Sequence, residues 1–122
     1  MVSSDLIDMD NMLSSPSFFD FLEKLDVDNA LNLRDSNPFD SEWMNNFNRL
    51  EKESFNKDDL DFIDILREKP FKSSFGIIND HEIASRILDD IEIIAKDILM
   101  GNTNGWPAKY LWRSYKNKKF PA

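Results

Sequence analysis

The side chains that could do chemistry in this sequence are concentrated in two short acidic runs. They are Asp58, Asp61 and Asp64 in the run DDLDFID, and Asp89, Asp90 and Glu92 in the run DDIE. Carboxylates spaced three residues apart lie about one turn from each other along a helix surface. Such a row can hold a divalent cation or face a cationic partner, and the surrounding residues decide between these two functions.

The surrounding residues argue against a metal site or an enzyme. The nearest match to a calcium loop, residues 26–37, has Leu31 in place of the turn glycine and Asn37 in place of the bidentate glutamate. The chain has no cysteine, and its only histidine, His81, lies in the first turn of a predicted helix, where a lone histidine is usually a surface residue. Glycine-rich phosphate loops, nucleophile elbows and His-Glu-x-x-His pairs are missing from the sequence. We expect no catalytic residues, no metal and no cofactor.

The distribution of charge favours a cationic partner. The chain carries 15 basic and 23 acidic residues, a net charge of −8, and five of the cations lie in the carboxylate-free stretch Asn104–Ala122. A surface this negative is unsuited to nucleic acids or anionic membranes, which are bound through cations. It suits a protein with a basic surface, through steering and charge complementarity. An ordinary solvated surface is the alternative interpretation of the same charges.

Length and composition are typical of one globular domain. The 122 residues include 41% hydrophobic residues, enough to form a core. No apolar run approaches the roughly 18 to 20 residues that span a bilayer. The N-terminus has no basic stretch followed by an apolar one, so no signal peptide is expected and the predicted compartment is the cytoplasm.

The spacing of apolar residues predicts an all-α fold, a single compact domain of about five to six short helices around a long isoleucine-rich helix at residues 80–100. Along that helix Ile83, Ile87, Ile91 and Ile94 recur at helical spacing. The acidic residues of the same helix are expected to lie off this isoleucine face: Asp89, Asp90, Glu92 and Asp97. Asn79 and Glu82 resemble a capping box at its start, and Gly101 is a typical stop.

The other elements are expected on either side of this helix. Helices are predicted at residues 5–13, at 15–26 with Ser15 as the cap and Pro16 in the first turn, at 41–55, and at 57–69, where Pro70 ends the last one. Residues 27–38 are expected to form a loop with at most one helical turn, and residues 71–80 are the one candidate for an extended segment.

The basic end of the chain, residues 104–122, has two possible functions. Its aromatic residues alternate with lysine and arginine, a combination that can bind nucleic acid by stacking and phosphate contact. Because the rest of the chain is strongly negative, we favour a structural function within a single domain of residues 1–122. Residues 104–122 are then a basic aromatic closing helix and tail, with a helix from Pro107 to about Lys116 that covers the isoleucine face.

The stretch EIASRILDDIEIIAKDILMGNTNGWPAKYLWRSY combines a helix ended by glycine, an Asn-rich turn and an aromatic helix near the end of a small acidic chain. Over about residues 80–115 this layout resembles bacterial toxin-immunity proteins, those paired with contact-dependent inhibition toxins and nuclease colicins. The resemblance implies a cytoplasmic, non-enzymatic protein that binds a cognate toxin domain, often over the active site of a basic nuclease. It transfers no residue roles, so the two acidic rows remain the predicted partner-binding residues.

A second function uses the same carboxylates on a different target. A phage-type acidic mimic of nucleic acid, or an adaptor, would inhibit a host DNA-binding or RNA-binding protein. Neither hypothesis involves direct binding to nucleic acid or to a membrane, and the sequence specifies no oligomeric state.

Overall fold

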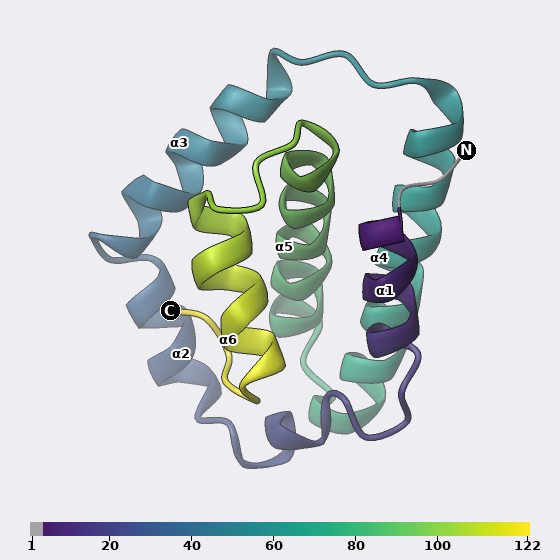
Figure 1. Cartoon of the computed structure of the whole chain (residues 1–122). Helices are drawn as coiled ribbons and strands as arrows, with labels where there is room; N and C mark the ends of the chain where they lie inside the picture. Colours follow the sequence, from purple (N-terminus) through teal and green to yellow (C-terminus); the bar gives the residue numbers. More distant parts are fainter. Residues whose placement is uncertain (1–3) are drawn as a thin grey trace.

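The regular secondary structure of the protein is helical throughout residues 4–122, the part of the chain described by the computed structural model (Figure 1). The elements are α1 (Ser4–Leu13), a 3-10 helix (Asp20–Lys24), α2 (Val27–Arg34), α3 (Phe39–Glu51), α4 (Lys57–Ile78), α5 (His81–Leu99), a π-helical segment (Pro107–Trp112) and α6 (Arg113–Lys116). The predicted all-α fold of a single compact domain is confirmed. Residues 1–3 of the predicted domain lie outside the described residues.

The isoleucine-rich helix α5 is the central element, as predicted. In Figure 1 it stands between α4 and α1 on one side and α2 and α3 on the other, with the C-terminal helical segment beside it. The isoleucines at 83, 87, 91 and 94 are completely buried. The Asp80 side chain caps the helix by accepting the Ile83 N–H at 2.9 Å, whereas Asn79 ends α4 with a left-handed φ of 55°. The predicted capping box at Asn79 is therefore displaced by one residue.

Helix α4 continues past Pro70, so the predictions that it ends there and that residues 71–80 are extended are wrong. Proline removes one backbone hydrogen bond from a helix interior and usually ends or kinks the helix. Here Ile63, Leu66, Pro70 and Ser74 follow each other at helical spacing and are all buried. The Ser74 hydroxyl donates to the Pro70 carbonyl at 2.5 Å. Burial of both halves of α4 on one face keeps the helix continuous.

Two further expectations for the N-terminal third are wrong. Residues 27–38 contain the two-turn helix α2, because Asp26 accepts the Asn29 N–H at 3.1 Å and so caps it. Residues 15–26 form turns and a short 3-10 helix in place of the predicted α-helix. Phe18 and Leu22 are nevertheless buried. Burying these side chains therefore does not require a regular helix.

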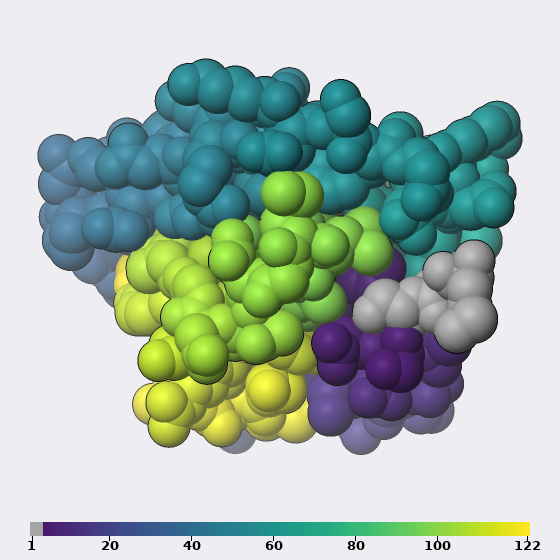
Figure 2. All heavy atoms as spheres, turned by 45° about the horizontal axis from the view of Figure 1, so that its top comes forward, coloured from purple at the N-terminus to yellow at the C-terminus, as the bar shows by residue number. Residues whose placement is uncertain are grey.

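The C-terminal segment packs into the core through its aromatic face. Leu111, Trp112 and Tyr115 are buried, and the Trp112 ring stacks on Phe18 with 5.8 Å between ring centroids. In Figure 2 the chain after α5, green to yellow, fills the space between α1 and α3. The start at Pro107 and the end at Lys116 agree with the predicted helix, although its first part is π-helical.

None of the described helices combines the length and the apolar composition needed to cross a membrane.

The turn between α5 and the C-terminal segment is held by Asp97, a buried carboxylate. Its Oδ1 atom lies 2.8 Å from Arg49 Nη1 on α3 and accepts the Asn102 Nδ2–H at 3.0 Å. The other oxygen faces Gly105, where a β-carbon would lie only 2.9 Å from it. Glycine at position 105 therefore allows the turn to approach the carboxylate closely.

We predict that Gly105→Ala destabilises the protein by about 1–3 kcal/mol, the usual range for overpacking a tight site. Gly76→Ala is the matched control, because Gly76 is exposed inside α4 and an added β-carbon meets no atom within 4 Å. That control should stabilise the protein by up to about 1 kcal/mol through helix propensity. Urea unfolding measures both values, and equal stabilities for the two variants would contradict this view of the turn.

Candidate partner-binding surface

The first predicted row of carboxylates lies on the exposed side of α4. Asp58, Asp61 and Asp64 are all exposed, at a spacing that places them along one side of the helix. Asp61 forms an exposed ion pair with Lys57 at 2.8 Å. Within the described part of the chain, Asp58 and Asp64 have no ion-pair partner. Two of the three charges are therefore left to solvent.

The second predicted row is divided between the surface and the core. Asp89 is exposed and Glu92 is partly exposed, but Asp90 is completely buried, as is Asp97 one heptad later. The expectation that Asp90 and Asp97 lie off the isoleucine face is wrong. Asp90 follows Ile87 by three residues and precedes Ile94 by four, a spacing that places all three on one helix face. This spacing is visible in the sequence and would have placed Asp90 in the core.

Four hydrogen bonds hold the buried Asp90 side chain. Arg34 on α2 donates from Nη1 to Oδ2 at 2.8 Å and from Nη2 to Oδ1 at 2.7 Å. Trp43 on α3 donates its indole N–H to Oδ1 at 2.8 Å, and Tyr115 on α6 donates its hydroxyl to Oδ2 at 2.6 Å. Both oxygens of Asp90 are therefore occupied by partners within the protein.

The electrostatics of this cluster keep Arg34 and Tyr115 in the forms that the hydrogen bonds need. Burial acts to lower the pKa of Arg34, but the charge of Asp90 and its hydrogen bonds outweigh burial and raise that pKa. Burial, together with the charge of Asp90, raises the pKa of the Tyr115 hydroxyl well above its ordinary value. Arg34 stays charged and Tyr115 stays protonated at neutral pH. Asp90 is thus a structural anchor and is not accessible to a partner.

Arg67 on α4 connects the outward-facing acids of the two helices. Its guanidinium lies 2.9 Å from Glu92 and 3.6 Å from Asp89, both on α5. Glu92 has a second cation, Lys96, at 3.5 Å. Arg67 and Asp64 also line a hollow of about 360 Å³ between the two helices. The structure therefore brings Asp64, Asp89 and Glu92 together around one arginine.

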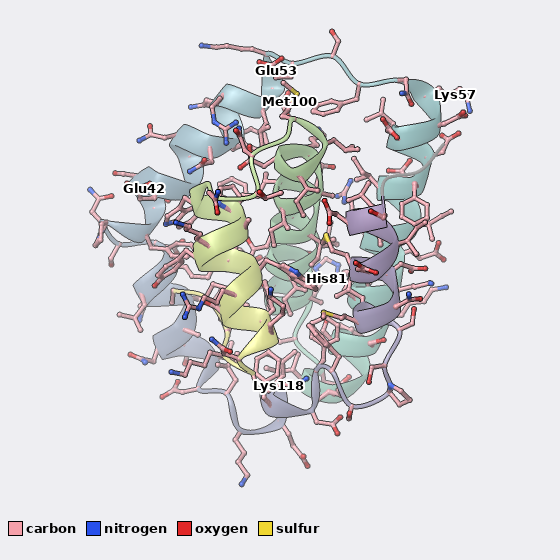
Figure 3. The ribbon with its side chains drawn as sticks, in the orientation of Figure 1. Glu42, Glu53, Lys57, His81, Met100 and Lys118 are labelled. Atoms are coloured by element: carbon pink, nitrogen blue, oxygen red, sulfur yellow. The ribbon has the colours of Figure 1, made fainter. Side chains whose placement is uncertain are left out.

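The floor of this hollow is apolar. Phe71 on α4 and Leu88 on α5 line it, and the Phe71 ring stacks with Phe75 at 6.1 Å between centroids. His81, labelled in Figure 3, packs edge-on against Phe71 at 5.6 Å and has no metal-binding partner in the described range. Apolar side chains surrounded by charged ones are typical of protein interfaces. We call this surface, formed by Asp58, Asp61, Asp64, Asp89, Glu92, Phe71 and Leu88, the α4–α5 face.

The negative charge of Asp89, on this face, is disfavoured by folding. Partial burial raises its pKa, and although Arg67 acts in the opposite direction, the charges of Asp90 and Glu92 raise it further. A carboxylate whose pKa is raised by folding is less favourable as an anion in the native state than in the unfolded chain. Folding therefore gains nothing from the negative charge of Asp89.

The described residues contain no group of three or more histidine, aspartate and glutamate side chains arranged to hold a metal ion.

The sequence model of a protein family described as immunity protein PIM1 matches residues 8–122, nearly the whole chain. The chain belongs to this family of immunity proteins. The predicted resemblance to immunity proteins is thereby confirmed, and the family match also covers both acidic rows. No curated protein matches the PIM1-family chain.

Two arginines that hold these sites together were missed in the sequence of the PIM1-family protein. Arg34 fell in a region expected to be a loop, and Arg67 lay beside a proline that was expected to end its helix. The signal for Arg34 was an acidic residue at a core position of α5, because a buried carboxylate needs a cationic or hydrogen-bonding partner. Nothing in the spacing indicated which cation that partner would be.

We predict very different effects on stability for two neighbouring substitutions in the PIM1-family protein. Asp90→Asn should lower the free energy of unfolding by about 3–5 kcal/mol, because it leaves Arg34 buried without a compensating charge. Asp89→Asn should leave stability at neutral pH within about 0.5 kcal/mol of the parent or slightly higher, since folding disfavours that charge. Chemical denaturation at pH 7 measures both. A loss in Asp89→Asn as large as that in Asp90→Asn would contradict the assignment of the two residues.

Proposed function

We propose that the protein neutralises a cognate toxin domain by binding a basic surface of that domain with its α4–α5 face. Asp64, which lines the hollow, and Asp58, six residues earlier on α4, carry this proposal. Both are exposed and without an ion-pair partner in the described structure. Unpaired like charges along a helix cost a few tenths of a kcal/mol each, so the fold alone does not benefit from them. Membership of an immunity protein family supports a toxin as the partner.

The charges of the face differ in how available they are to the toxin. Glu92 is compensated by Arg67 and Lys96, so we assign it mainly to positioning Arg67. The pair between Lys57 and Asp61 is exposed to solvent, where ion pairs contribute little, and is easily exchanged for a pair with the toxin. Asp58, Asp64 and Asp89 are then the main contacts for cationic side chains. Asp90, part of the predicted row, is excluded from the interface by its burial.

A nuclease is the toxin class that this surface suits best. Nucleases bind the phosphate backbone through lysine and arginine. An acidic face of a protein with net charge −8 is attracted to such a site over long range and competes with the substrate there. The protein itself acts as a binder without catalytic residues, in the cytoplasm where such a toxin reaches its substrate. Family membership favours this function over mimicry of nucleic acid toward a host protein.

We predict that the triple variant Asp58→Asn, Asp61→Asn, Asp64→Asn folds normally but associates with the toxin at least about tenfold more slowly at low salt. The binding partner to use is the cognate toxin domain, which we expect to be encoded next to this gene, with kinetics measured by surface plasmon resonance. Cells that carry the variant should lose protection against that toxin. Association of the parent should slow as salt rises, because exposed charges are screened beyond about 10 Å at 0.1 M.

The matched control is the triple variant Asp20→Asn, Glu23→Gln, Asp28→Asn, which removes the same number of exposed charges around the 3-10 helix and α2. It should keep most of the association rate and all of the protection. If both triple variants protect as well as the parent, with affinity independent of salt, the α4–α5 face is not the binding surface. If both weaken binding equally, only the net charge matters and the face has no special function.

A further inference from the structure

A second concave site lies away from the α4–α5 face, between the junction of α2 and α3 and the start of the C-terminal helical segment. It has a volume of about 230 Å³ and is mostly apolar. Three aromatic rings line it, Phe39 from α3 and Trp106 and Tyr110 from the C-terminal segment, together with Leu33 and Pro38. We call it the aromatic pocket.

The three rings pack against one another in a single cluster, in which Trp106 and Tyr110 stack and Phe39 is inclined to both. Trp106 and Tyr110 stack nearly parallel, with centroids 5.4 Å apart and an angle of 8° between the ring planes. Phe39 meets Trp106 at 62° with centroids 5.3 Å apart, and Tyr110 at 56° and 6.1 Å. The ring faces that remain open attract cations, since the face of each ring is the negative end of its quadrupole, whereas Arg34 already lies over one face of Phe39.

The protein holds the walls in place before any partner arrives. The Tyr110 hydroxyl donates to the Ala122 carbonyl at 2.6 Å. The guanidinium carbon of Arg34 lies 4.7 Å from the centroid of the Phe39 ring, and Arg34 is itself fixed by Asp90. A site with fixed walls loses little conformational entropy on binding.

The rim of the pocket carries one charged residue, Glu42, among the residues that line it. Figure 3 labels Glu42 on α3, and this residue lines the pocket together with Trp106 and Tyr110 of the C-terminal segment. Its side chain is exposed and forms no ion pair within the described part of the chain. Leu33, at 52% exposure, and Tyr110, at 42%, leave apolar surface open around it. A carboxylate beside a cluster of aromatic rings suits a ligand that has an apolar stem and a cationic head.

We propose that the aromatic pocket binds the side chain of a single lysine or arginine of the toxin. The methylene stem of that side chain would lie along Leu33 and Pro38, and its head would lie against the rings within reach of Glu42. A phosphate or carboxylate ligand would be repelled by Glu42, and a purely apolar side chain would leave the carboxylate without a partner. That the lysine or arginine comes from the toxin rests on the proposed function, whereas the preference for a cationic ligand is a property of the pocket itself.

The preference for a cation is tested without the toxin, using N-butylguanidinium and its neutral counterpart N-butylurea as probes. Each is titrated into ¹⁵N-labelled protein while the indole N–H signal of Trp106 is followed by NMR. We expect saturable shifts with N-butylguanidinium at millimolar concentration, at least about fivefold tighter than with N-butylurea. Equal affinity for the two probes, or shifts at Trp106 with neither, overturns the proposal.

Substitution of Glu42 identifies the source of that preference. Glu42→Gln should reduce the preference for the cationic probe to the part that the rings supply, while the control Glu51→Gln, an exposed glutamate at the other end of α3, should keep it in full. Retention of the full preference in Glu42→Gln overturns the proposal. Both variants should unfold at the parent's midpoint, because Glu42 is exposed and makes no ion pair among the described residues.

The complex with the toxin then separates this inference from the proposed function. Glu42→Gln should weaken the complex about tenfold, mainly through faster dissociation, with Glu51→Gln unchanged. An unchanged complex in Glu42→Gln, alongside a weakened one in the α4 triple variant, refutes the pocket as a toxin contact and leaves the α4–α5 face standing. The reverse pattern refutes the α4–α5 face and leaves the pocket standing.

Discussion

The buried ion pair between Arg34 and Asp90 is the contact on which the arrangement of the helices depends. Asp90 lies in the middle of the central helix and accepts hydrogen bonds from α2, α3 and α6 at once. Arg34 also donates to the Pro121 carbonyl at 3.1 Å, so the last residues of the chain are attached to the same cluster. Removing one member of a buried pair is strongly destabilising, because it leaves the other charge without compensation. The cluster therefore specifies how the peripheral helices sit on α5.

Both proposed contact surfaces are attached to this cluster. The aromatic pocket has one wall on α3 and another on the C-terminal segment, and Asp90 holds α3 through Trp43 and the C-terminal segment through Tyr115. On the other side, the residue next to Asp90 in sequence is Asp89, which faces outward toward Arg67. The helical period thus divides two adjacent aspartates between the core and the surface. Net charge alone does not reveal this division, since it counts buried and exposed carboxylates alike.

The parts of the fold predicted from the sequence were those with a strong and consistent apolar period. The buried isoleucines of α5 recur at helical spacing, and Gly101, at φ 84°, follows the end of the helix. The apolar period and the local residue preferences therefore predict the same helix. The prediction failed at Pro70, where burial of Leu66 and Ser74 on the same face outweighed the local preference of proline. It failed again at α2, whose polar sequence has little apolar period and is held mainly by Asp26 and by the contact of Arg34 with Asp90.

The candidate site was predictable only for residues whose contacts are local. Exposure of Asp58, Asp61 and Asp64 followed from their spacing on one helix, but the position of Arg67 between α4 and α5 depends on how the two helices pack. The three rings of the aromatic pocket come from Phe39, Trp106 and Tyr110, which are more than 60 residues apart in sequence at their extremes. The apolar period within one helix does not predict contacts between side chains of different helices. The charge of Asp90 favours a surface position, whereas its spacing from Ile87 and Ile94 places it on the buried face of α5.

The most direct test of this account is a double-mutant cycle on the buried pair, with Arg34→Met, Asp90→Leu and the combined variant compared by urea unfolding. We expect each single substitution to cost about 3–5 kcal/mol, since each leaves a buried charge unpaired. The combined variant, which buries neither charge, should lose at least about 2 kcal/mol less than the sum of the two single losses. Losses that simply add would contradict the claim that Arg34 and Asp90 depend on each other in holding the helices together.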